Sequence, residues 1–234
     1  SQKELEETGK ELRAYGWKKQ QEAGIDFIPS NDFSFYDNML DTAFLLNAVP
    51  SRYTELGLSE LETYFAASHG YQGEKGDVKA LPMKKWFNTN YHYLVPELSD
   101  DTKITLSANP KPLAEFNEAK AAGLQTIPSV TGPYTFLHLA TKTGNKTSLD
   151  FADAVVNAFE ELGEKLSKAG AEYFTFAEPA LILDTSEKEK AIFADMYKKL
   201  IPQFKKSGLK VILQTYFGDV RDVYKEITEL GFDG

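Results

Sequence analysis

Cysteine is the most informative absence from this sequence, since it does not occur once in 234 residues. Without it the chain forms no disulfide, presents no thiolate nucleophile and offers no thiolate ligand to a metal. Histidine is also scarce, and His69, His92 and His138 lie far apart in unrelated sequence contexts. These residues therefore cannot build a zinc site that contains thiolates.

Basic charge and long apolar runs are lacking as well. The chain has 26 Lys and Arg against 35 Asp and Glu, for a formal net charge of -9. Nucleic-acid binding requires a clustered basic surface, so we expect no nucleic-acid partner. No run approaches the roughly 20 apolar residues that span a bilayer, and no charged-then-apolar leader opens the sequence. We therefore expect no membrane association and a cytoplasmic location.

A pattern that does recur is a small residue, then glycine, then an apolar run. It occurs at Ala23-Gly24-Ile25, Ala122-Gly123-Leu124, Ala169-Gly170-Ala171 and Ser207-Gly208-Leu209, with Leu230-Gly231-Phe232 as a close variant. Glycine ends a helix at low cost in the left-handed conformation, and a β-prone run follows each time. Helical periodicity precedes it, as in Val155, Phe159 and Leu162, and Ser186 with Glu189 predicts a capping box. The repeated unit is helix, turn and strand.

Serial strand and helix units build either a doubly wound sheet or a closed (βα)8 barrel. No GxGxxG phosphate fingerprint follows any predicted strand, which weakens the dinucleotide-binding version of the open sheet. Polar residues cluster just past the predicted strand ends, where a barrel places its ligand groups. These clusters are Ser30 to Asp32, Thr131 to Pro133, Glu178 with Pro179, and Thr215 to Asp219. We therefore predict a barrel.

The number of predicted strands falls short of the eight that a barrel requires. Strands are expected near 25–29, 103–107, 125–130, 172–177 and 210–216, with a sixth beginning at Phe232. The fold class is thus α/β of the (βα)8 TIM-barrel type, incomplete, with about five to six strands. We interpret residues 1–234 as one partial barrel domain, an internal fragment that opens with a helix. An irregular excursion at about 54–102 is expected on the ligand face.

The segment from Met83 to Glu97 reads MKKWFNTNYHYLVPE and follows neither a helical nor a strand period. It combines lysines, asparagines, a histidine, a tryptophan and tyrosines. Basic side chains can bind an anion, amides can orient it, and aromatic rings can cover an apolar group. An aromatic loop that simply packs on its own domain has similar composition. The segment alone therefore indicates a binding loop without identifying its ligand.

This segment resembles the WF-(D/N)-TNYHY-x-VPE signature of the cobalamin-independent methionine synthases. Three further segments resemble that family in the same order and at similar spacing. They are Asp26 to Tyr53, Thr131 to Ala140 (TGPYTFLHLA) and Phe176 to Leu181 (FAEPAL). The four matches cover most of the chain, which is therefore similar to the N-terminal barrel of that family.

The resemblance implies what such a fragment does. Members of the family have two similar barrels and transfer a methyl group from 5-methyltetrahydropteroyltri-L-glutamate to L-homocysteine. A zinc ion activates the homocysteine thiol, and its ligands are one histidine, one glutamate and two cysteines of the C-terminal barrel. The resemblance thus implies no catalytic residue and no metal ligand in this chain. The fragment is expected to be inactive without the C-terminal barrel.

Two candidate substrate-binding residues follow from the same resemblance. The family's N-terminal barrel helps to hold the folate, and its residues match Lys85, directly before the WF pair, and Asn90, directly before YHY. A polyglutamate tail is a string of carboxylates, so an acidic chain must supply local cations. Lysine provides a point charge and asparagine an uncharged donor. Lys84 is expected to face solvent, and the absent basic N-terminal segment of the family leaves this site half built.

Other polar residues have simpler structural interpretations. His92 lies between two tyrosines and is more typical of a structural donor than of a ligand group. Asp37 and Asp41 are four apart and predict a helix cap and a solvated or pairing position. Glu178 follows a predicted strand, a place that is catalytic in many barrels, but here we interpret it as a relic of barrel duplication.

Two other classes of protein remain open at this stage. The chain could be a self-sufficient barrel enzyme of the uroporphyrinogen decarboxylase or corrinoid methyltransferase type, or a folate-binding module without catalysis. The length of the reading frame discriminates between the enzyme and the module. An open edge on the last strand also predicts self-association or disorder at that end.

Overall fold

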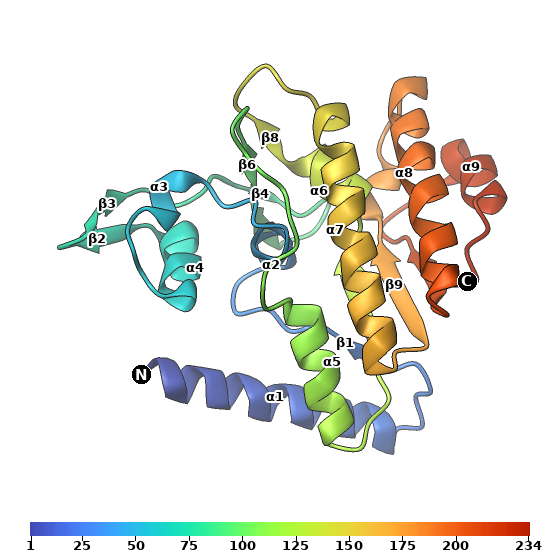
Figure 1. Cartoon of the computed structure of the whole chain (residues 1–234), viewed down its shortest axis with the longest axis horizontal. Helices are drawn as coiled ribbons and strands as arrows, with labels where there is room; N and C mark the ends of the chain where they lie inside the picture. The colour runs from blue at the N-terminus through green and yellow to red at the C-terminus, as the bar shows by residue number, and fades with distance from the viewer.

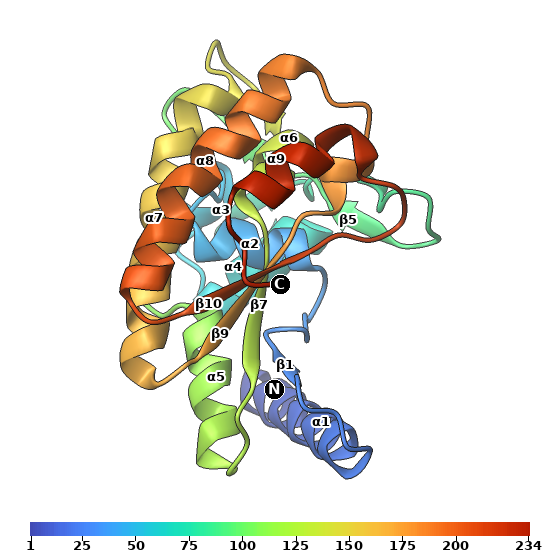
Figure 2. The ribbon, with the colours of Figure 1, turned by 90° about the vertical axis from the view of Figure 1, so that its right-hand side faces the viewer.

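A four-stranded parallel sheet lies at the centre of the molecule (Figure 2). The computed structural model describes residues 1–234, and the strands lie in the order β1, β7, β9, β10. Their bounds are Pro29–Ser30 for β1, Ile127–Thr131 for β7, Tyr173–Ala177 for β9 and Lys210–Gln214 for β10. All three neighbouring pairs are parallel. Parallel strands joined by helices form part of a βα barrel, so the predicted fold class, an incomplete barrel, is confirmed.

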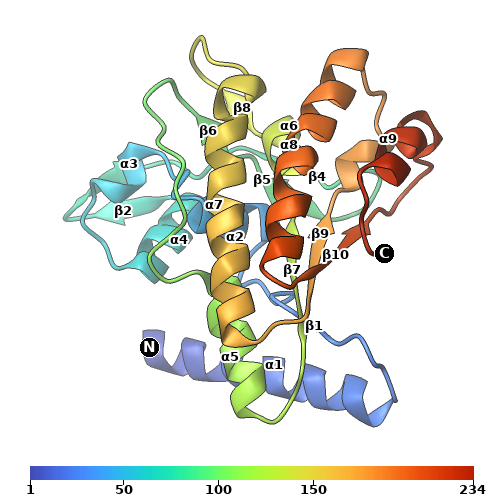
Figure 3. The ribbon, with the colours of Figure 1, turned by 45° about the vertical axis from the view of Figure 1, so that its right-hand side comes forward.

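Three helices cover one face of this sheet (Figures 1 and 3). They are α5 (Lys111–Ala121), α7 (Ser148–Ala169) and α8 (Glu187–Lys206). Outward-facing aromatic residues of β9 meet them, with the Phe176 ring 5.5 Å from Phe159 and the Phe174 ring 5.0 Å from Phe204. These residues belong to a core of 38 buried side chains. Burying that much apolar surface is the main force that holds the sheet and helices together.

The other face of the sheet is the inner wall of the incomplete barrel. A cavity of about 340 Å³ lies there, and its lining includes Ser129, Thr175, Ile212 and Gln214. In the register of the sheet, Ser129 lies opposite Thr175, and Thr175 opposite Ile212. Side chains alternate between the two faces of a strand, so these residues point inward while Phe174 and Phe176 point to the helices.

The predicted helix ends are confirmed. Each glycine of the recurring pattern has a positive φ angle: Gly24 77°, Gly123 80°, Gly170 97°, Gly208 88° and Gly231 81°. The predicted capping box also forms at the start of α8. There the Glu189 carboxylate accepts the Ser186 N–H at 2.9 Å, and the Ser186 hydroxyl accepts the Glu189 N–H at 3.3 Å. Local sequence signals thus fix where the helices begin and stop.

The strand predictions need three corrections. Residues 103–107 form no strand, because their backbone donors bond to the end of α2 (Asn38–Leu45), with Thr105 N–H to Leu46 O at 3.1 Å. The strand expected at 25–29 is reduced to Pro29 and Ser30, because proline cannot donate to a ladder and only two residues pair with β7. The segment after Phe232 bonds to β10 but is not itself a strand. The central sheet therefore has four strands and not five or six.

Helix α1 (Gln2–Glu22) lies across one end of the domain beneath α5 (Figure 1). Trp17 anchors it in a small cluster with Ile28, Ala119 and Leu124. The predicted excursion at 54–102 contains a helix and two hairpins. The elements from 51 to 98 are α3 Ser51–Thr54, α4 Glu60–His69, β2 Tyr71–Gly73, β3 Gly76–Val78, β4 Met83–Lys85, β5 His92–Leu94 and β6 Glu97–Leu98.

The remaining elements connect the barrel units. They are α6 Pro133–Leu139, β8 Thr141–Lys142, the short 3-10 turns Pro179–Ile182 and Arg221–Val223, and α9 Tyr224–Glu229. None of the helices is both long enough and apolar enough to cross a membrane.

Candidate functional site

Residues 83–94, which contain the WFNTNYHY segment, form the β4–β5 hairpin and its turn. The strands are antiparallel, with Lys84 opposite Tyr93 and Lys85 opposite His92. The turn closes through the Trp86 N–H, which donates to Tyr91 O at 2.7 Å, and through the Thr89 hydroxyl, which donates to Trp86 O at 2.6 Å. The irregular composition of this segment thus reflects a hairpin with a six-residue turn, Trp86 to Tyr91.

The base of the hairpin is held by a buried carboxylate. Asp37 Oδ2 accepts the Leu94 N–H at 2.9 Å, and Asp37 Oδ1 caps α2 by accepting the Leu40 N–H at 2.8 Å. Burial raises the pKa of Asp37 to about 6, although both N–H donors oppose that shift. The cap predicted for Asp37 is therefore confirmed, and the same residue also fixes the hairpin to the domain.

Both predicted binding residues lie on this hairpin with exposed side chains. Lys85 ends β4, and its side-chain ammonium has no ion-pair or hydrogen-bond partner within the chain. Asn90 lies exposed in the turn. Lys84 is exposed as expected. His92 is exposed and its ring makes no hydrogen bond, so the structural-donor interpretation of His92 is wrong. The hairpin thus presents two cations without ionic partners, Lys84 and Lys85, and one free amide, Asn90, to solvent.

Aromatic contacts surround the turn. The Trp86 ring lies 4.9 Å from Phe87 and 5.6 Å from Tyr93. Phe87 in turn lies 5.5 Å from Phe217, which follows β10. Tyr91 is 77% exposed and is the most exposed large apolar residue of the chain. Most of the aromatic rings of the segment therefore pack on the protein, while Tyr91 faces outward.

Glu178 lies at the end of β9, fully buried and without a cation. Its carboxylate accepts the N–H groups of Tyr134 at 3.0 Å and Thr135 at 2.6 Å, and the Tyr197 hydroxyl at 2.6 Å. Burial raises the pKa of Glu178 to about 7 against the effect of these donors. Glu178 therefore ties β9 to α6 and α8, a structural role that its position after a strand did not reveal.

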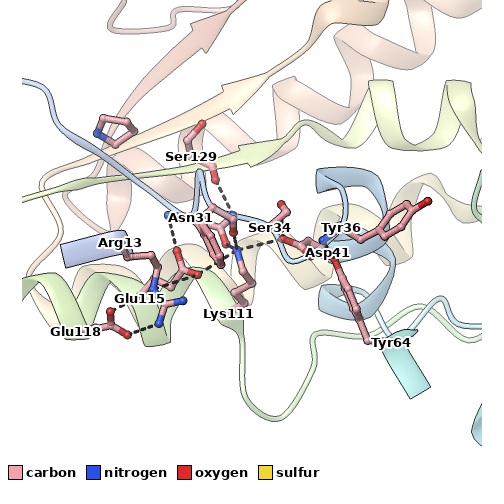
Figure 4. A network of polar contacts seen from close by, with 12 residues as sticks. Arg13, Asn31, Ser34, Tyr36, Asp41, Tyr64, Lys111, Glu115, Glu118 and Ser129 are labelled. Carbon is pink, nitrogen blue, oxygen red and sulfur yellow. Dashed lines mark hydrogen bonds and ion pairs between the residues drawn. The ribbon is translucent and has the colours of Figure 1, made fainter. Parts of the chain in front are cut away.

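A second polar network lies between α1, α2 and α5 (Figure 4). Arg13 binds Glu118 through two hydrogen bonds of 3.1 and 2.7 Å. Lys111 lies 3.1 Å from the Asp41 carboxylate and 3.2 Å from the Glu115 carboxylate. This confirms Asp41 as a pairing position. A cleft of about 440 Å³ opens beside the network.

Sequence reasoning missed this network, because its links between helices, Arg13 with Glu118 and Asp41 with Lys111, join residues that are far apart in the sequence and that no motif connects. Every cation in it is already paired with a carboxylate. Arg13 and Lys111 are therefore not free to bind an anion, in contrast to Lys85.

The residues present do not fit the zinc site of the family that the sequence resembles. Cysteine is absent, and no group of three His, Cys, Asp or Glu side chains is placed to hold a metal. His69 ends α4, His92 lies on β5 and His138 on α6, so the three histidines do not converge. No chemical step on this chain is therefore assigned to zinc.

The fold and the site define a protein of the incomplete βα-barrel class with an exposed hairpin. The family model for the N-terminal domain of cobalamin-independent synthase matches residues 1–234. The chain belongs to that family. This sets aside the uroporphyrinogen decarboxylase and corrinoid methyltransferase types.

Relatives are similar along the whole chain. A 5-methyltetrahydropteroyltriglutamate–homocysteine methyltransferase from Streptococcus sanguinis is 52% identical over 233 residues, which are 100% of this chain and 31% of that protein. The protein of the same name from Lactococcus lactis is 51% identical over 234 residues, or 100% of this chain and 30% of its own length. The chain thus spans about a third of the length of the curated relatives that it matches.

A solved structure supports the fold. A Listeria monocytogenes protein named a vitamin B12-independent methionine synthase superposes with a TM-score of 0.62 at 13% identity. The superposition covers 98% of this chain and 61% of the Listeria chain.

Proposed function

We propose that this domain holds the glutamate tail of 5-methyltetrahydropteroyltri-L-glutamate in a protein that transfers its methyl group to L-homocysteine. The names of the relatives supply the reaction. The observation that carries the proposal is Lys85, an exposed cation without an ionic partner on the signature hairpin of a chain with net charge -9. A polyglutamate tail is polyanionic, so an unpaired lysine is the group that it needs.

Lys85 supplies the charge, and the amide of Asn90 donates a hydrogen bond without adding charge. Neither residue touches the reacting methyl group, and we assign no catalytic residue to this chain. In this proposal the C-terminal barrel of the same protein is the partner that supplies zinc and binds homocysteine. The cytoplasmic location expected from the sequence stays a prediction.

The binding module without catalysis is the second candidate. A reading frame that continues for several hundred residues, with a histidine and two cysteines, supports the enzyme. A stop codon near Gly234 supports the module. In both cases the hairpin binds the same tail.

Replacing Lys85 by alanine tests the tail site directly. We expect Lys85→Ala to weaken binding of the triglutamate folate by about 1 to 3 kcal/mol, the range for losing a charge-assisted hydrogen bond. Asn90→Ala should cost less, because it removes a neutral donor. NMR titration of the isotope-labelled chain measures these affinities even when they are weak. The Lys85 effect should shrink as salt is raised, since the side chain is exposed.

Lys84→Ala is the matched control, because Lys84 is a neighbouring exposed lysine on the same strand. Both substitutions remove one positive charge. A larger loss of affinity in Lys85→Ala than in Lys84→Ala therefore reflects the position of Lys85 and not the change in net charge. Equal losses of monoglutamate and triglutamate affinity in Lys85→Ala would show that Lys85 does not bind the tail.

The chain alone should bind no zinc stoichiometrically and form no methionine. The reason is its lack of thiolate ligands and of any converging metal-ligand group. Metal analysis after dialysis and a methionine-formation assay measure both properties. Retained zinc at one ion per chain, or any turnover, would contradict the division of roles proposed above.

A further inference from the structure

The β4–β5 hairpin stands apart from the central sheet, since its two strands pair only with each other. Backbone and carboxylate hydrogen bonds hold its base, from Leu94 N–H to Asp37 at 2.9 Å and from Val95 N–H to Pro82 O at 2.8 Å. Toward the turn, Trp86 and Phe87 pack against the main core, and the Phe87 ring meets Phe217 outside the hairpin at 5.5 Å. The position of the turn therefore depends on side-chain packing.

Two of these aromatic residues have strained backbones. Phe87 has a φ angle of 51° and Phe217 one of 78°. A bulky side chain rarely adopts this left-handed region, and such strain persists only where the surroundings determine it. The two residues are far apart in the sequence, yet their rings meet at 5.5 Å with an interplanar angle of 36°. The paired strain indicates that this contact is a feature of the site and not incidental packing.

Burial alone does not account for Phe217. Its side chain is 49% exposed, so a polar residue or glycine in that loop would avoid both the strain and the exposed apolar surface. The Phe217 ring contacts its neighbour Tyr216 at 4.6 Å and, outside its own loop, Phe87 at 5.5 Å. Phe87 lies next to Trp86, whose ring packs on Tyr93. A chain of rings therefore runs from the end of β10 to both strands of the hairpin.

We propose that Phe217 is a positioning residue that fixes the turn of the hairpin, and with it Lys85 and Asn90, for binding the glutamate tail. The inference rests on the proposed function of the hairpin. A flexible polyanion loses much conformational freedom on binding, so donors that are already in place bind it more tightly than donors that must first be ordered. Phe217 acts through Phe87 and does not contact the ligand.

The test compares variants that separate the ring from the backbone strain. Phe217→Asn removes the ring, and asparagine tolerates the left-handed conformation, so the fold should be retained. Phe217→Gly is a second variant without the ring. Phe217→Tyr keeps the ring. Phe27→Ala is the control, because Phe27 is 57% exposed and its ring packs on Tyr173 away from the hairpin.

Hydrogen exchange of residues 83–94 measures the hairpin without any ligand, with the β2–β3 hairpin at 71–78 as the internal reference. Phe217→Asn should accelerate hydrogen exchange in residues 83–94 and weaken binding of the triglutamate folate. Each effect should be roughly 2- to 10-fold, which corresponds to the loss of one aromatic pair. Exchange at 71–78 should not change. Phe217→Tyr should restore both values, and Phe27→Ala should alter neither.

Three other outcomes would overturn the inference that Phe217 positions the hairpin for binding. Unchanged exchange in both variants without the ring would show that Phe217 does not hold the hairpin. Faster exchange with unchanged triglutamate affinity, while Lys85→Ala still weakens binding, would refute positioning and leave the proposed function standing. No effect of Lys85→Ala would refute the proposed function, and the ligand part of this inference with it.

Discussion

Glu178 illustrates how a single residue at a strand end can be structural. It is fully buried and accepts three hydrogen bonds, from Tyr134, Thr135 and Tyr197, with no cation beside it. Gly132 is required beside it, since a Cβ atom there would lie 2.2 Å from the Glu178 carboxyl. The carboxylate therefore joins β9 to the first turn of α6 and to α8, and its removal should affect stability and not chemistry.

The raised pKa of Glu178 predicts a specific pH dependence. An acid whose pKa rises from 4.5 to about 7 on folding binds more protons in the native state, so its contribution to stability is full below pH 4.5 and is lost as pH rises through 7. Glu178→Gln cannot titrate. The difference in free energy of unfolding, wild type minus variant, should therefore fall by about 3 kcal/mol between pH 4.5 and 7.

Urea unfolding at several pH values measures this difference. Taking the difference between the two proteins cancels the other titrating groups, including Asp37, whose pKa is raised to about 6. A difference that does not change with pH would mean that Glu178 keeps the same protonation state in the folded and unfolded chain.

Sequence reasoning at the residue scale succeeded where the cause was local. The cap at Asp37 and the capping box at Ser186 depend on residues three apart, and both form. The hydrogen bond expected for the His92 ring does not form, since the ring is exposed to solvent. Such a bond depends on another element of the fold and not on neighbouring residues. The contacts of Glu178 and those behind the proposed role of Phe217 cross the fold, and no local pattern could predict them. The exposure of Lys85 and Asn90 agrees with their proposed role, which stays a prediction.

At the scale of elements, the approach of α7 to α8 depends on one glycine. A Cβ atom at Gly163 of α7 would lie 2.8 Å from the ring of Phe204 on α8, and that ring is only 1% exposed. Gly16 within α1 offers a matched contrast, because a Cβ atom there would meet nothing within 4 Å.

Alanine at these two glycines should have opposite effects. Gly16→Ala should stabilise the protein by up to about 1 kcal/mol, the gain in helix propensity. Gly163→Ala gains the same propensity but forces Phe204 to move, and overpacking costs about 1 to 3 kcal/mol, so the net effect should be destabilising. Chemical denaturation of both variants measures the two signs. Stabilisation by Gly163→Ala would show that the α7–α8 interface can widen without cost.

The helices were easier to predict than the strands for a physical reason. Helix ends carry their own signals in caps and glycines, whereas a strand exists only if a neighbour pairs with it. Residues 103–107 have a β-prone composition, yet they bond to the end of α2 at Leu45 and Leu46. β7, β9 and β10 were placed within a few residues, because their apolar runs are buried against helices.

At the scale of the whole molecule, the outer edge of β10 is where the sequence predicts self-association. An uncovered edge is a template for pairing with another strand. Here the C-terminal residues lie along it, with Asp233 N–H donating to Val211 O at 2.8 Å and Leu213 N–H donating to Gly234 O at 2.9 Å. The Asp233 carboxylate also accepts the Val211 N–H at 2.8 Å. Self-association through this edge, expected from the sequence, therefore requires the C-terminal residues to move away.

Graded changes at Asp233 should control that step. Asp233→Ala removes the carboxylate that accepts the Val211 N–H but keeps the backbone donor, while Asp233→Pro removes both. Self-association should rise from wild type to Ala to Pro, with the proline variant dimerising roughly tenfold more strongly, the effect of losing about two net hydrogen bonds from the covering segment. Sedimentation velocity over a range of concentrations measures this order. Asp222→Ala, which removes an exposed aspartate of the same charge, is the control for net charge. If all four proteins associate equally, the contact between copies lies elsewhere than the β10 edge.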